Sequence, residues 1–425
     1  MNLFDDLQWR GMVYDATDGL RDALSAGRMT AYIGFDPTAS SLHVGSLLTV
    51  MGLARLQRSG HAPIALVGGG TGMIGDPSGK SQERVLLSLE QIDENVAGIR
   101  AQLARFLDFD APANPARIVN NADWLAKLDM LGFLRDTGKY FTVNYMLQKE
   151  SVSRRLESED GISYTEFSYL LLQSRDFLEL FDRFGCTLQM GGSDQWGNIT
   201  AGIDLVRRLR ASKAHGLVWP LMMTAAGAKF GKTETGTIWL DPARTPPFKF
   251  YQFWLNTDDR DVVQYLKFFT FLERDEIAPL ETATRTAPEK REAQRALAEV
   301  VTSVVHGKEW AARAAHASSL LFGEDITTLD VDDLLAVFDD VPSTEMSTAE
   351  FAGQGVGIVD LVARVQLASS KGEARRLVQS GGVYVNNRRV SDAQSTVTAR
   401  DAIGGRVMVL RKGQKQNHLV RLTPG

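Results

Sequence analysis

The first half of the chain alternates short apolar runs with longer segments of helical length. Residues 31–35 and 63–67 are compact apolar runs, and residues 44–59 between them are long enough for a helix that ends before Gly60. This order predicts a β-α-β unit, because parallel strands need a long crossover and a helix usually supplies it.

The alternation continues along the chain. We expect further helices over 81–106 and 165–184 and a further strand over 186–190. Such a chain favours an α/β domain with a Rossmann-like, mostly parallel sheet, whose ligands bind beyond the carboxyl ends of the strands. Residues that carry chemistry should therefore lie in loops that lead from a strand into a helix.

The pattern changes after residue 239. Residues 248–272 and 287–321 are typical of helices, and residues 319–357 contain nine Asp or Glu and no Lys or Arg. An acidic segment of this kind indicates a domain boundary. The predicted parts are an α/β catalytic domain over 1–240, a helical domain over 241–325, an acidic linker over 326–357 and a small α+β domain over 358–425.

The net charge of -5 is divided unevenly along the chain. Residues 358–425 hold 12 Lys or Arg and four Asp or Glu, a net charge of +8, which leaves -13 for residues 1–357. A total near neutrality argues against a nucleic-acid partner, but a basic tail favours one. We therefore expect the tail to bind nucleic acid.

Cysteine content and hydropathy exclude several classes of protein. The single cysteine, Cys186, excludes an intrachain disulfide framework and a Cys-cluster metal site. The first 19 residues lack the apolar core of a signal peptide, and no uncharged apolar run reaches 18 residues. These features predict a cytoplasmic protein with no membrane partner.

The first predicted strand leads into a helix through a distinctive segment. His43 lies at the helix start, where free backbone N–H groups and the positive end of the helix dipole favour phosphate oxygens. Gly45 would let a flat ring approach the backbone closely. A lone His-x-Gly is more often an ordinary loop, so the context has to decide between these interpretations.

The context resembles a known family. Tyr32-Ile-Gly34-Phe-Asp36-Pro-Thr38-Ala, followed by Ser-Leu-His43-Val-Gly45, resembles the signature of class I aminoacyl-tRNA synthetases in their bacterial tyrosyl form. The resemblance continues in order through residues 68–80, 165–176, 191–199 and 229–233 and into the tail. One position departs from the family pattern: Ser46 stands where a second His usually contacts the nucleotide, and its hydroxyl can donate one hydrogen bond.

The resemblance implies an enzyme, its substrates and its assembly. A tyrosine–tRNA ligase activates L-tyrosine with ATP and Mg²⁺ to tyrosyl-adenylate and pyrophosphate, then transfers tyrosine to the 3' end of tRNA(Tyr). ATP is a substrate, and no structural metal is expected on the protein. The family also implies a homodimer, for which residues 132–145 are a plausible interface.

Residues 70–81 invite two other interpretations. Gly70-Thr-Gly72-Met-Ile-Gly75 fits the dinucleotide fingerprint, but a turn with Asp76 follows where a helix should open. Residues 75–81 have three residues between their glycines where a Walker loop needs four. Neither phosphate loop is well formed.

One predicted helix carries a polar stripe. Tyr169, Gln173 and Asp176 have i, i+4 and i+7 spacing on a helix that is otherwise rich in Phe and Leu. Buried polar groups must pair with each other or with a ligand, so the helix by itself leaves a core network and a binding site equally open.

The resemblance favours a tyrosine site. It implies that Tyr32 and Asp176 bind the substrate phenol, which would exclude phenylalanine. Tyrosyl-tRNA synthetases are themselves the standard case of this discrimination, so its size, about 10⁵-fold, is the family's. The residues implied to bind tyrosine or to support its pocket are Tyr32, Thr71, Asp76, Asn121, Tyr169, Gln173, Asp176 and Gln195.

A lysine-containing loop follows further along the chain. Residues 224–237 contain three Gly with Lys229 and Lys232 three apart, which by composition indicates a flexible turn. The segment Lys229-Phe-Gly-Lys232-Thr233 resembles the class I Lys-Met-Ser-Lys-Ser loop. The resemblance assigns catalysis, by positioning and by charge stabilisation, to Thr38, His43, Lys80, Arg84, Lys229, Lys232 and Thr233. It assigns ATP binding to Gly34, Asp36, His43, Gly45, Asp194 and Lys232.

The basic tail resembles a small RNA-binding domain named after a ribosomal small-subunit protein. A charged helix is more often a solvated face, but the net +8 favours phosphate binding. The candidate tRNA-binding residues are Lys371, Arg375, Arg376, Arg388, Arg389, Arg411 and Lys412.

Three competing functions leave parts of the sequence unexplained. A nicotinamide-dependent oxidoreductase built on residues 70–75 accounts for neither the lysine loop nor the tail. An RNA-binding or RNA-modifying protein leaves Tyr32, His43 and Asp176 without a role. A tryptophanyl-tRNA synthetase would share the phosphate motifs but would not need Tyr32 and Asp176 to read a phenol.

Overall fold

The structure is a computed structural model that describes residues 2–78, 87–157, 161–228, 230–233, 236–320, 326, 330–338, 341–413 and 416–424. The chain forms two compact units, the first from residues 1–245 and 257–297 and the second from residues 246–256 and 298–425. Among the described residues, no helix is both long and apolar enough to span a membrane.

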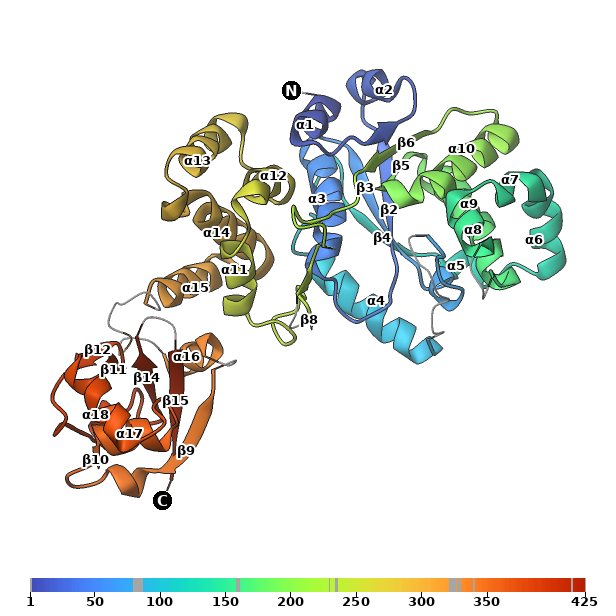
Figure 1. The fold of residues 1–425 in the computed structure, drawn as a ribbon. Helices are drawn as coiled ribbons and strands as arrows, with labels where there is room; N and C mark the ends of the chain where they lie inside the picture. The colour runs from blue at the N-terminus through green and yellow to red at the C-terminus, as the bar shows by residue number, and fades with distance from the viewer. Residues whose placement is uncertain are drawn as a thin grey trace. The chain divides into compact units, whose positions relative to one another are not determined.

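The first unit is built on a six-stranded sheet with the order β1-β6-β5-β2-β3-β4 (Figure 1). All neighbouring strands are parallel except the edge pair β1 and β6. The strands are β1 (Asp15–Ala16), β2 (Thr30–Phe35), β3 (Ala62–Val67), β4 (Arg117–Asn120), β5 (Cys186–Gly192) and β6 (His215–Trp219). The predicted α/β fold with a Rossmann-like sheet is confirmed.

Helices cover both faces of this sheet. Helix α3 (Val44–Arg58) lies on one face, and α9 (Tyr164–Phe184) and α10 (Trp196–Arg210) lie on the other (Figure 1). Because side chains alternate along a strand, Tyr32 joins the core that contains the α9 residue Phe177, whereas Ile33 lies on the α3 side near Gly52. This alternation brings Tyr32 onto the face that α9 covers.

Local capping fixes where the two principal helices begin. The His43 side chain caps α3 by accepting from the Gly45 N–H, and Ser163 caps α9 by accepting from the Glu166 N–H. The other α-helices of the first unit are α1 (Leu3–Arg10), α2 (Leu20–Ala26), α4 (Leu89–Leu103), α5 (Ala122–Leu125), α6 (Met130–Asp136), α7 (Val143–Leu147), α8 (Glu150–Leu156), α12 (Asp259–Phe269) and α13 (Arg274–Thr286).

Three long predicted helices differ from the observed ones. The helix expected over 81–106 begins at Leu89 in its described part, with Ser88 as N-cap. The prediction of one helix over 248–272 is wrong, because α11 ends at Leu255 and a new helix, α12, begins after its N-cap residue Asp258. The helix expected over 287–321 is likewise interrupted at Gly307, whose φ of 101° is left-handed.

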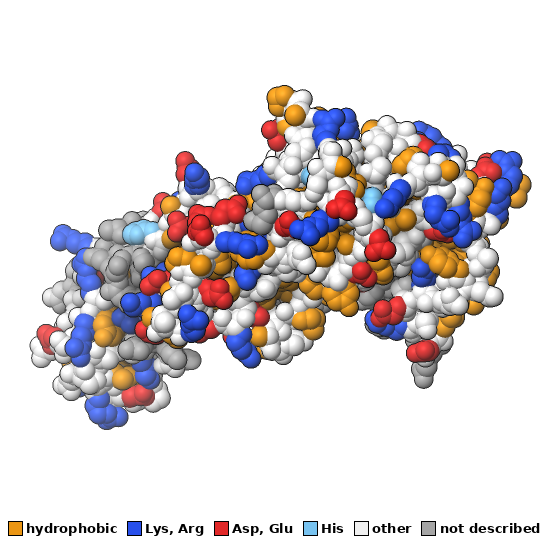
Figure 2. Space-filling model, turned by 90° about the horizontal axis from the view of Figure 1, so that it is seen from above, with side chains coloured by type: hydrophobic (Ala, Val, Ile, Leu, Met, Phe, Trp, Pro, Cys, Tyr) orange, Lys and Arg blue, Asp and Glu red, His pale blue; other side chains and the backbone are white. Residues whose placement is uncertain are grey.

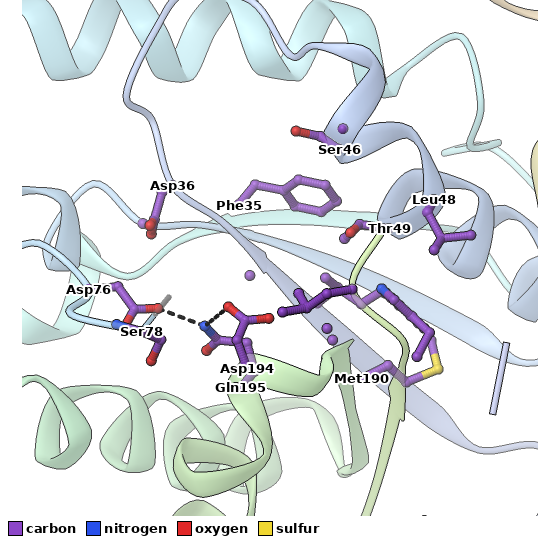
Figure 3. A pocket seen from close by; sticks show the side chains of 18 of the residues that line it. Phe35, Asp36, Ser46, Leu48, Thr49, Asp76, Ser78, Met190, Asp194 and Gln195 are labelled. Atoms are coloured by element: carbon purple, nitrogen blue, oxygen red, sulfur yellow. Dashed lines mark hydrogen bonds between the residues drawn. The ribbon is translucent and has the colours of Figure 1, made fainter. Parts of the chain in front are cut away.

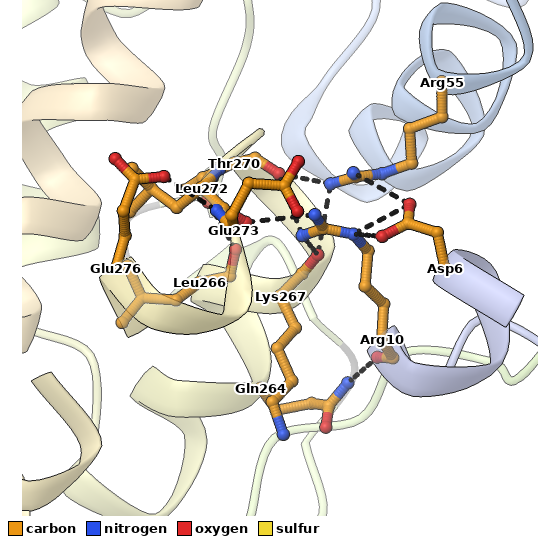
Figure 4. A network of polar contacts seen from close by, with 10 residues as sticks. All are labelled: Asp6, Arg10, Arg55, Gln264, Leu266, Lys267, Thr270, Leu272, Glu273 and Glu276. Atoms are coloured by element: carbon orange, nitrogen blue, oxygen red, sulfur yellow. Dashed lines mark hydrogen bonds and ion pairs between the residues drawn. The ribbon is translucent and has the colours of Figure 1, made fainter. Parts of the chain in front are cut away.

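A buried arginine cluster joins three helices of the first unit (Figure 4). Arg10 of α1 and Arg55 of α3 share the Asp6 carboxylate, and both donate to the Lys267 carbonyl near the end of α12. Arg55 also donates to the Thr270 carbonyl. Burial, with the nearby Arg10 charge, lowers the pKa of Arg55 to about 9. The cluster therefore fixes α3, whose other end carries His43, against α12.

The second unit contains helices and a small C-terminal domain. Its helices are α11 (Pro247–Leu255), α15 (Lys308–Leu320), α16 (Val331–Val337), α17 (Ile358–Arg364), α18 (Lys371–Gln379) and the C-terminal part of α14 (Glu292–His306). A five-stranded sheet has the order β12-β11-β14-β15-β9. The C-terminal strands are β9 (Ser343–Ser347), β10 (Val356–Gly357), β11 (Val383–Val385), β12 (Arg388–Val390), β13 (Thr396–Val397), β14 (Val407–Lys412) and β15 (Gln416–Thr423).

The segment expected to be an acidic linker contributes to this domain. Strand β9 pairs in parallel with β15, and Met346 and Phe351 are buried in the same core as Val420. Within residues 326–357, the part from β9 onward therefore packs as domain structure. Buried Met346 and Phe351 account for this difference, because the acidic count over the whole segment concealed its few core residues.

Candidate active site

A cavity of about 530 Å³ opens at the carboxyl ends of the parallel strands β2, β3 and β5 (Figure 3). It is lined by residues of these strands, of α3 and α9, and of the loop after β5. Figure 3 shows Asp76 joined to Gln195 by a hydrogen bond, with Asp194 beside Gln195. This is the edge at which doubly wound sheets bind their ligands.

Two buried oxygen-bearing side chains line the cavity from opposite elements. Tyr32 of β2 and Asp176 of α9 are each 1% exposed. Within the described residues, the Tyr32 hydroxyl is buried without a hydrogen-bond partner. Asp176 accepts from Trp124 Nε1 at 2.7 Å through Oδ1 and from Asn121 Nδ2 at 2.9 Å through Oδ2. The carboxylate is thus oriented, and the Tyr32 hydroxyl remains for a ligand.

Burial shifts the pKa of both groups. Desolvation raises the pKa of Asp176 to about 7, although the two hydrogen bonds from Asn121 and Trp124 oppose the shift. Burial, together with the Asp176 charge, raises the pKa of Tyr32 well above its ordinary value. Tyr32 is therefore a neutral hydroxyl donor, and Asp176 changes charge near neutral pH.

A second polar network lies beside the same cavity. Gln195 Nε2 donates to Asp76 Oδ2 at 2.7 Å and to Asp194 Oδ2 at 3.2 Å. Gln173 Nε2 donates to Gln195 Oε1 at 3.1 Å, and Asn198 Nδ2 donates to Gln173 Oε1 at 3.0 Å. This network of amide side chains holds the carboxylates of Asp76 and Asp194 in place. The two carboxylates give this part of the cavity a negative charge, which suits an ammonium group and ribose hydroxyls.

The start of α3 forms another wall. The Gly45 N–H donates to His43 Nδ1 at 3.0 Å, so the proton of the neutral imidazole lies on Nε2. A Cβ on Gly45 would lie 2.7 Å from the His43 ring, and only glycine leaves room for this cap. His43, Gly45 and Ser46 all line the cavity.

The lysine loop is attached to this wall. The Val44 N–H donates to the Ile238 carbonyl, and Gly231 has a φ of 81° with its Cα hydrogen toward Val44 and Gly45. A Cβ on Gly231 would come within 2.8 Å of Val44 Cγ2. The glycine between the two lysines therefore permits the close approach of the loop to α3.

Aromatic packing anchors the same loop from its other side. Phe230 stacks on Phe269 with ring centroids 5.3 Å apart and meets Tyr265 edge-on at 5.0 Å. Both partners belong to α12, the helix whose end is held by the arginine cluster. Phe230 therefore fixes the lysine loop against α12.

Comparison with known proteins identifies the family. Residues 24–323 match the model of "tRNA synthetases class I (W and Y)", and residues 333–420 match that of the "Tyrosine--tRNA ligase SYY-like C-terminal domain". The chain belongs to the class I aminoacyl-tRNA synthetases.

Full-length relatives and a solved structure support this membership. A tyrosine–tRNA ligase from Roseiflexus castenholzii is 54% identical over 99% of both chains, and one from Geobacillus kaustophilus is 52% identical over 99% of this chain and 100% of the relative. The C-terminally truncated mitochondrial tyrosyl-tRNA synthetase of Aspergillus nidulans superposes with a TM-score of 0.68 at 32% identity, covering 76% of this chain and 94% of that one.

The structure of this synthetase brings most candidate residues of the tyrosine and ATP sites to one cavity. Those that line it are Tyr32, Gly34, Asp36, His43, Gly45, Thr71, Asp76, Tyr169, Gln173, Asp176, Asp194 and Gln195. Asn121 lies behind the wall, where it donates to Asp176 and Thr71. Thr38 is exposed in the loop after β2 and is not among the lining residues.

Several predicted phosphate-binding residues cannot be placed. Lys80, Arg84 and Lys229 lie outside the described residues. Lys232 and Thr233 form β7 (Lys232–Thr233), which pairs with β8 (Gly236–Thr237), and only their backbone is described. Residues 71–73 form a 3₁₀ turn and do not open an α-helix, which removes the support for a dinucleotide loop.

The C-terminal cations of the synthetase differ in what they contact. Lys371 pairs with Asp360 at 2.6 Å, and Lys412 pairs with Glu373 at 3.2 Å. Arg389 donates to the Ser380 and Gly381 carbonyls at the end of α18. These three side chains have contacts within the domain itself.

The other candidates lie on β12, β14 and α18. Arg411 lies over the Tyr384 ring at 4.0 Å and donates to the Gly413 carbonyl at 3.1 Å, and Arg388 is exposed on β12. Arg375 and Arg376 project from α18, where both are exposed. Figure 2 shows Lys and Arg side chains spread over the surface of this domain on the face it displays.

Sequence reasoning missed four residues of the site. Trp124 orients Asp176, Asn198 and Ser78 extend the amide network, and Gln189 lines the cavity with its Oε1 buried and unpaired among the described residues. Gln189 could have been found from the register of two strands, because it lies directly opposite Tyr32 in the β2–β5 pair. Nothing in the local sequence signals the contact of Trp124, which joins residues 52 positions apart.

Proposed function

We propose that this chain is a tyrosine–tRNA ligase that activates L-tyrosine with Mg-ATP and transfers the tyrosyl group to tRNA(Tyr). The observation that carries the proposal is the buried pair Tyr32 and Asp176, one a hydroxyl without a partner and the other a carboxylate oriented by two donors. A phenol complements this pair because it both accepts and donates one hydrogen bond.

The two groups would bind the phenol in complementary directions. The Tyr32 hydroxyl donates to the phenol oxygen, and the phenol hydroxyl donates to the ionised Asp176. Trp124 and Asn121 hold the carboxylate in the orientation that leaves a lone pair for this bond. Phenylalanine would leave both buried groups unpaired, which is the basis for rejecting it.

The amide network would bind the other end of the amino acid. The Asp76 carboxylate, held by Gln195 and by the Ser78 N–H at 2.8 Å, accepts from the ammonium group. Tyr169 and Gln173, which line the cavity from α9, complete this part of the site. Thr71 and Asn121 support the wall between the two ends of the substrate.

ATP would bind between the start of α3 and the loop after β5. His43 Nε2–H and the positive end of the α3 dipole suit the phosphates, Gly34, Asp36 and Gly45 border the nucleotide, and Asp194 suits the ribose hydroxyls. Lys80, Arg84, Lys229, Lys232, Thr38 and Thr233 are the proposed further contacts to the triphosphate. Mg²⁺ would accompany the phosphates, whose negative charge it offsets.

The chemistry follows from this placement. A tyrosine carboxylate oxygen forms a bond to the α-phosphorus while the bond from that phosphorus to the bridging oxygen of pyrophosphate breaks. The chain's groups act by positioning and by stabilising the leaving charge. The terminal ribose hydroxyl of tRNA then attacks the tyrosyl carbonyl and AMP leaves. Because tRNA and ATP are its substrates, we place the enzyme in the cytoplasm.

Two assays test the function together. Purified protein should catalyse ATP–pyrophosphate exchange that depends on tyrosine, and should charge tRNA(Tyr) with labelled tyrosine. Tryptophan in the exchange assay and NAD in a binding assay serve as controls for the competing functions. Exchange driven by tryptophan, or no exchange with tyrosine, would refute the proposal.

We further propose that the enzyme is a homodimer. Of the eleven large hydrophobic side chains exposed among the described residues, seven lie between residues 130 and 164. They are Met130, Leu131, Leu134, Val143, Leu147, Leu156 and Tyr164, and they include part of the predicted segment 132–145. A second copy is the favoured occupant because clustered apolar exposure marks interfaces and tyrosine, ATP and tRNA bind elsewhere.

Sedimentation velocity tests the dimer. Leu131, which is 77% exposed, is replaced by Glu, and Tyr14, which is 68% exposed outside this cluster, is replaced by Glu as the matched control. Leu131→Glu should shift the protein to a monomer at micromolar concentration, while Tyr14→Glu stays dimeric. A wild-type monomer would contradict the proposal.

A further inference from the structure

The C-terminal domain contains a second cavity that the proposed function leaves unused. It has a volume of about 350 Å³ and lies between the β11–β12 hairpin and residues 395–404. All of its lining residues belong to the second unit. We call it the hairpin cavity.

A hydrogen bond connects the walls of the hairpin cavity. Asn386 and Asn387, with φ values of 47° and 62°, form the tight turn of the hairpin. Asn386 Nδ2 donates to the Asp401 carbonyl on the opposite wall, and its Oδ1 accepts from the Val409 N–H at 2.8 Å. The domain's own hydrogen bonds therefore fix the hairpin turn against the opposite wall of the cavity.

The lining of the cavity is apolar below and cationic at its rim. Ile358, Val385 and Val397 are buried and belong to the domain core. Arg388 of the hairpin and Arg400 of the segment 395–404 also line the cavity, and both are exposed. An apolar surface under two guanidinium groups suits a flat ring that carries an anionic group.

The acidic and hydroxyl groups of the lining fit the same ligand. Asp401 is the single carboxylate among the lining residues, and it accepts from the Thr398 N–H at 2.7 Å and from Thr398 Oγ1 at 3.0 Å. These bonds hold the exposed Asp401 carboxylate toward Thr398, which is not among the lining residues. Ser395 and Thr396 add hydroxyl groups that can bond to the edge of a base.

The size of the cavity and the charge of the domain narrow the choice further. A volume of about 350 Å³ is at the small end of the range for small-ligand pockets and is too small for a helix or a duplex. Residues 358–425 carry a net charge of +8. Single-stranded RNA is commonly read through bases that leave the stack and pack on apolar or guanidinium surfaces.

We propose that the hairpin cavity receives one unpaired nucleotide of the bound tRNA, with its base on the apolar floor and its phosphate between Arg388 and Arg400. This inference rests on the proposed function, which supplies the RNA. It adds to that function a site for a single splayed nucleotide in the C-terminal domain, lined by different residues from the cavity proposed for tyrosine and ATP.

Filling the cavity tests the inference in the full-length protein. Ser395→Trp places an indole in the lining, and Gln394→Trp places one at the exposed neighbouring residue outside it. With a fluorescently labelled tRNA(Tyr) transcript at fixed salt, Ser395→Trp should raise the Kd about tenfold, the size expected for losing one stacked base. Gln394→Trp should stay within about twofold of the wild type.

A surface substitution tests the same site without the risk that Ser395→Trp misfolds the domain. Arg400→Gln should raise the Kd severalfold, whereas Arg406→Gln, at an exposed arginine outside the lining that pairs with Asp332, should not. Thermal unfolding should be unchanged in Arg400→Gln. Tyrosine-dependent exchange should be unchanged in all four variants, because none of them alters the catalytic unit.

Abasic substitutions in the tRNA identify the nucleotide. Each unpaired position outside the 3' end is made abasic in turn, and one position should weaken binding to the wild type about tenfold with no further loss in Ser395→Trp. Wild-type Kd values for both Ser395→Trp and Arg400→Gln would overturn the inference. So would losses that add to Ser395→Trp at every abasic position, a result that indicates another occupant such as an acidic peptide. Failure of tyrosine-dependent exchange with normal tRNA binding would instead refute the proposed function.

Discussion

The two regions of this synthetase that we propose to bind ligands differ in how their polar groups are held. In the catalytic cavity, Asp176 and Asp76 are buried and each accepts from donors on other elements. In the C-terminal domain, Arg375 and Arg376 are exposed on one helix, and Lys371 and Lys412 pair with surface acids. A buried network ties each residue to one task, whereas a charged surface distributes binding over many side chains.

Replacing Asp176, the buried carboxylate of the cavity, should produce the largest loss of activity. Asp176→Asn removes the charged acceptor proposed for the phenol and should lower kcat/KM for tyrosine roughly 100-fold, about 3 kcal/mol, in pyrophosphate exchange. Glu179→Gln on the same helix is the control, because Glu179 pairs with Arg175 and Arg183 away from the cavity. A loss of less than fivefold in Asp176→Asn would break the contrast between the two regions.

The lysine loop should respond next most strongly. Gly231→Ala combines a left-handed φ of 81° with a contact of 2.8 Å to Val44 Cγ2 and should slow adenylate formation roughly 30-fold, about 2 kcal/mol. Gly227→Ala has a similar φ of 78° but meets nothing within 4 Å. Single-turnover kinetics should show the larger loss at Gly231 with tyrosine affinity unchanged, and equal losses at both glycines would exclude a role for the contact with α3.

The raised pKa of Asp176 should make tyrosine binding depend on pH. Burial raises this pKa to about 7, so the fraction of free enzyme with the ionised acceptor grows as pH rises through neutrality. Tyrosine affinity should therefore increase about tenfold between pH 6 and pH 8, since the phenol donates to the ionised form. Equilibrium titrations check this, and Asp176→Asn should show a flat profile. A flat wild-type profile would contradict the assignment.

Surface cations should give the smallest effect. The double variant Arg375→Gln, Arg376→Gln should weaken tRNA binding about fivefold and reduce the slope of log K against log salt by about 2. The double variant Lys371→Gln, Lys412→Gln should change both the tRNA affinity and the salt slope less, because both lysines are paired within the domain. Filter binding over a salt series distinguishes the pairs. Equal effects would show that internal pairing does not decide which cations bind RNA.

The same contrast explains what the sequence could and could not predict. The strands β2 and β3 were recognisable because residues 31–35 and 63–67 are compact apolar runs, whereas β4 is only four residues long and carries Arg117 and Asn120 at its ends. The polar stripe on α9 was visible from its spacing. The sequence could not show whether this stripe forms a core network or lines a cavity, because that depends on contacts of Asp176 with Asn121 and Trp124 from another part of the chain.

In the C-terminal domain the sequence showed charge but not its use. The net +8 predicted a basic domain, yet composition could not separate Arg389, which holds the end of α18, from Arg376, which is exposed. Composition also concealed β9 within an acidic segment, since pairing with β15 is a long-range contact. A count of residues gives the net charge of a domain, but the role of each charged side chain depends on which residues it contacts.

The central claim is that the buried pair Tyr32 and Asp176 selects tyrosine for activation. The most direct measurement compares tyrosine, phenylalanine and tryptophan as substrates for ATP–pyrophosphate exchange by the wild-type protein. We expect rapid exchange with tyrosine, exchange lower by several orders of magnitude with phenylalanine, and none with tryptophan, because neither analogue satisfies both buried groups. Exchange with phenylalanine or tryptophan within about tenfold of that with tyrosine would contradict it.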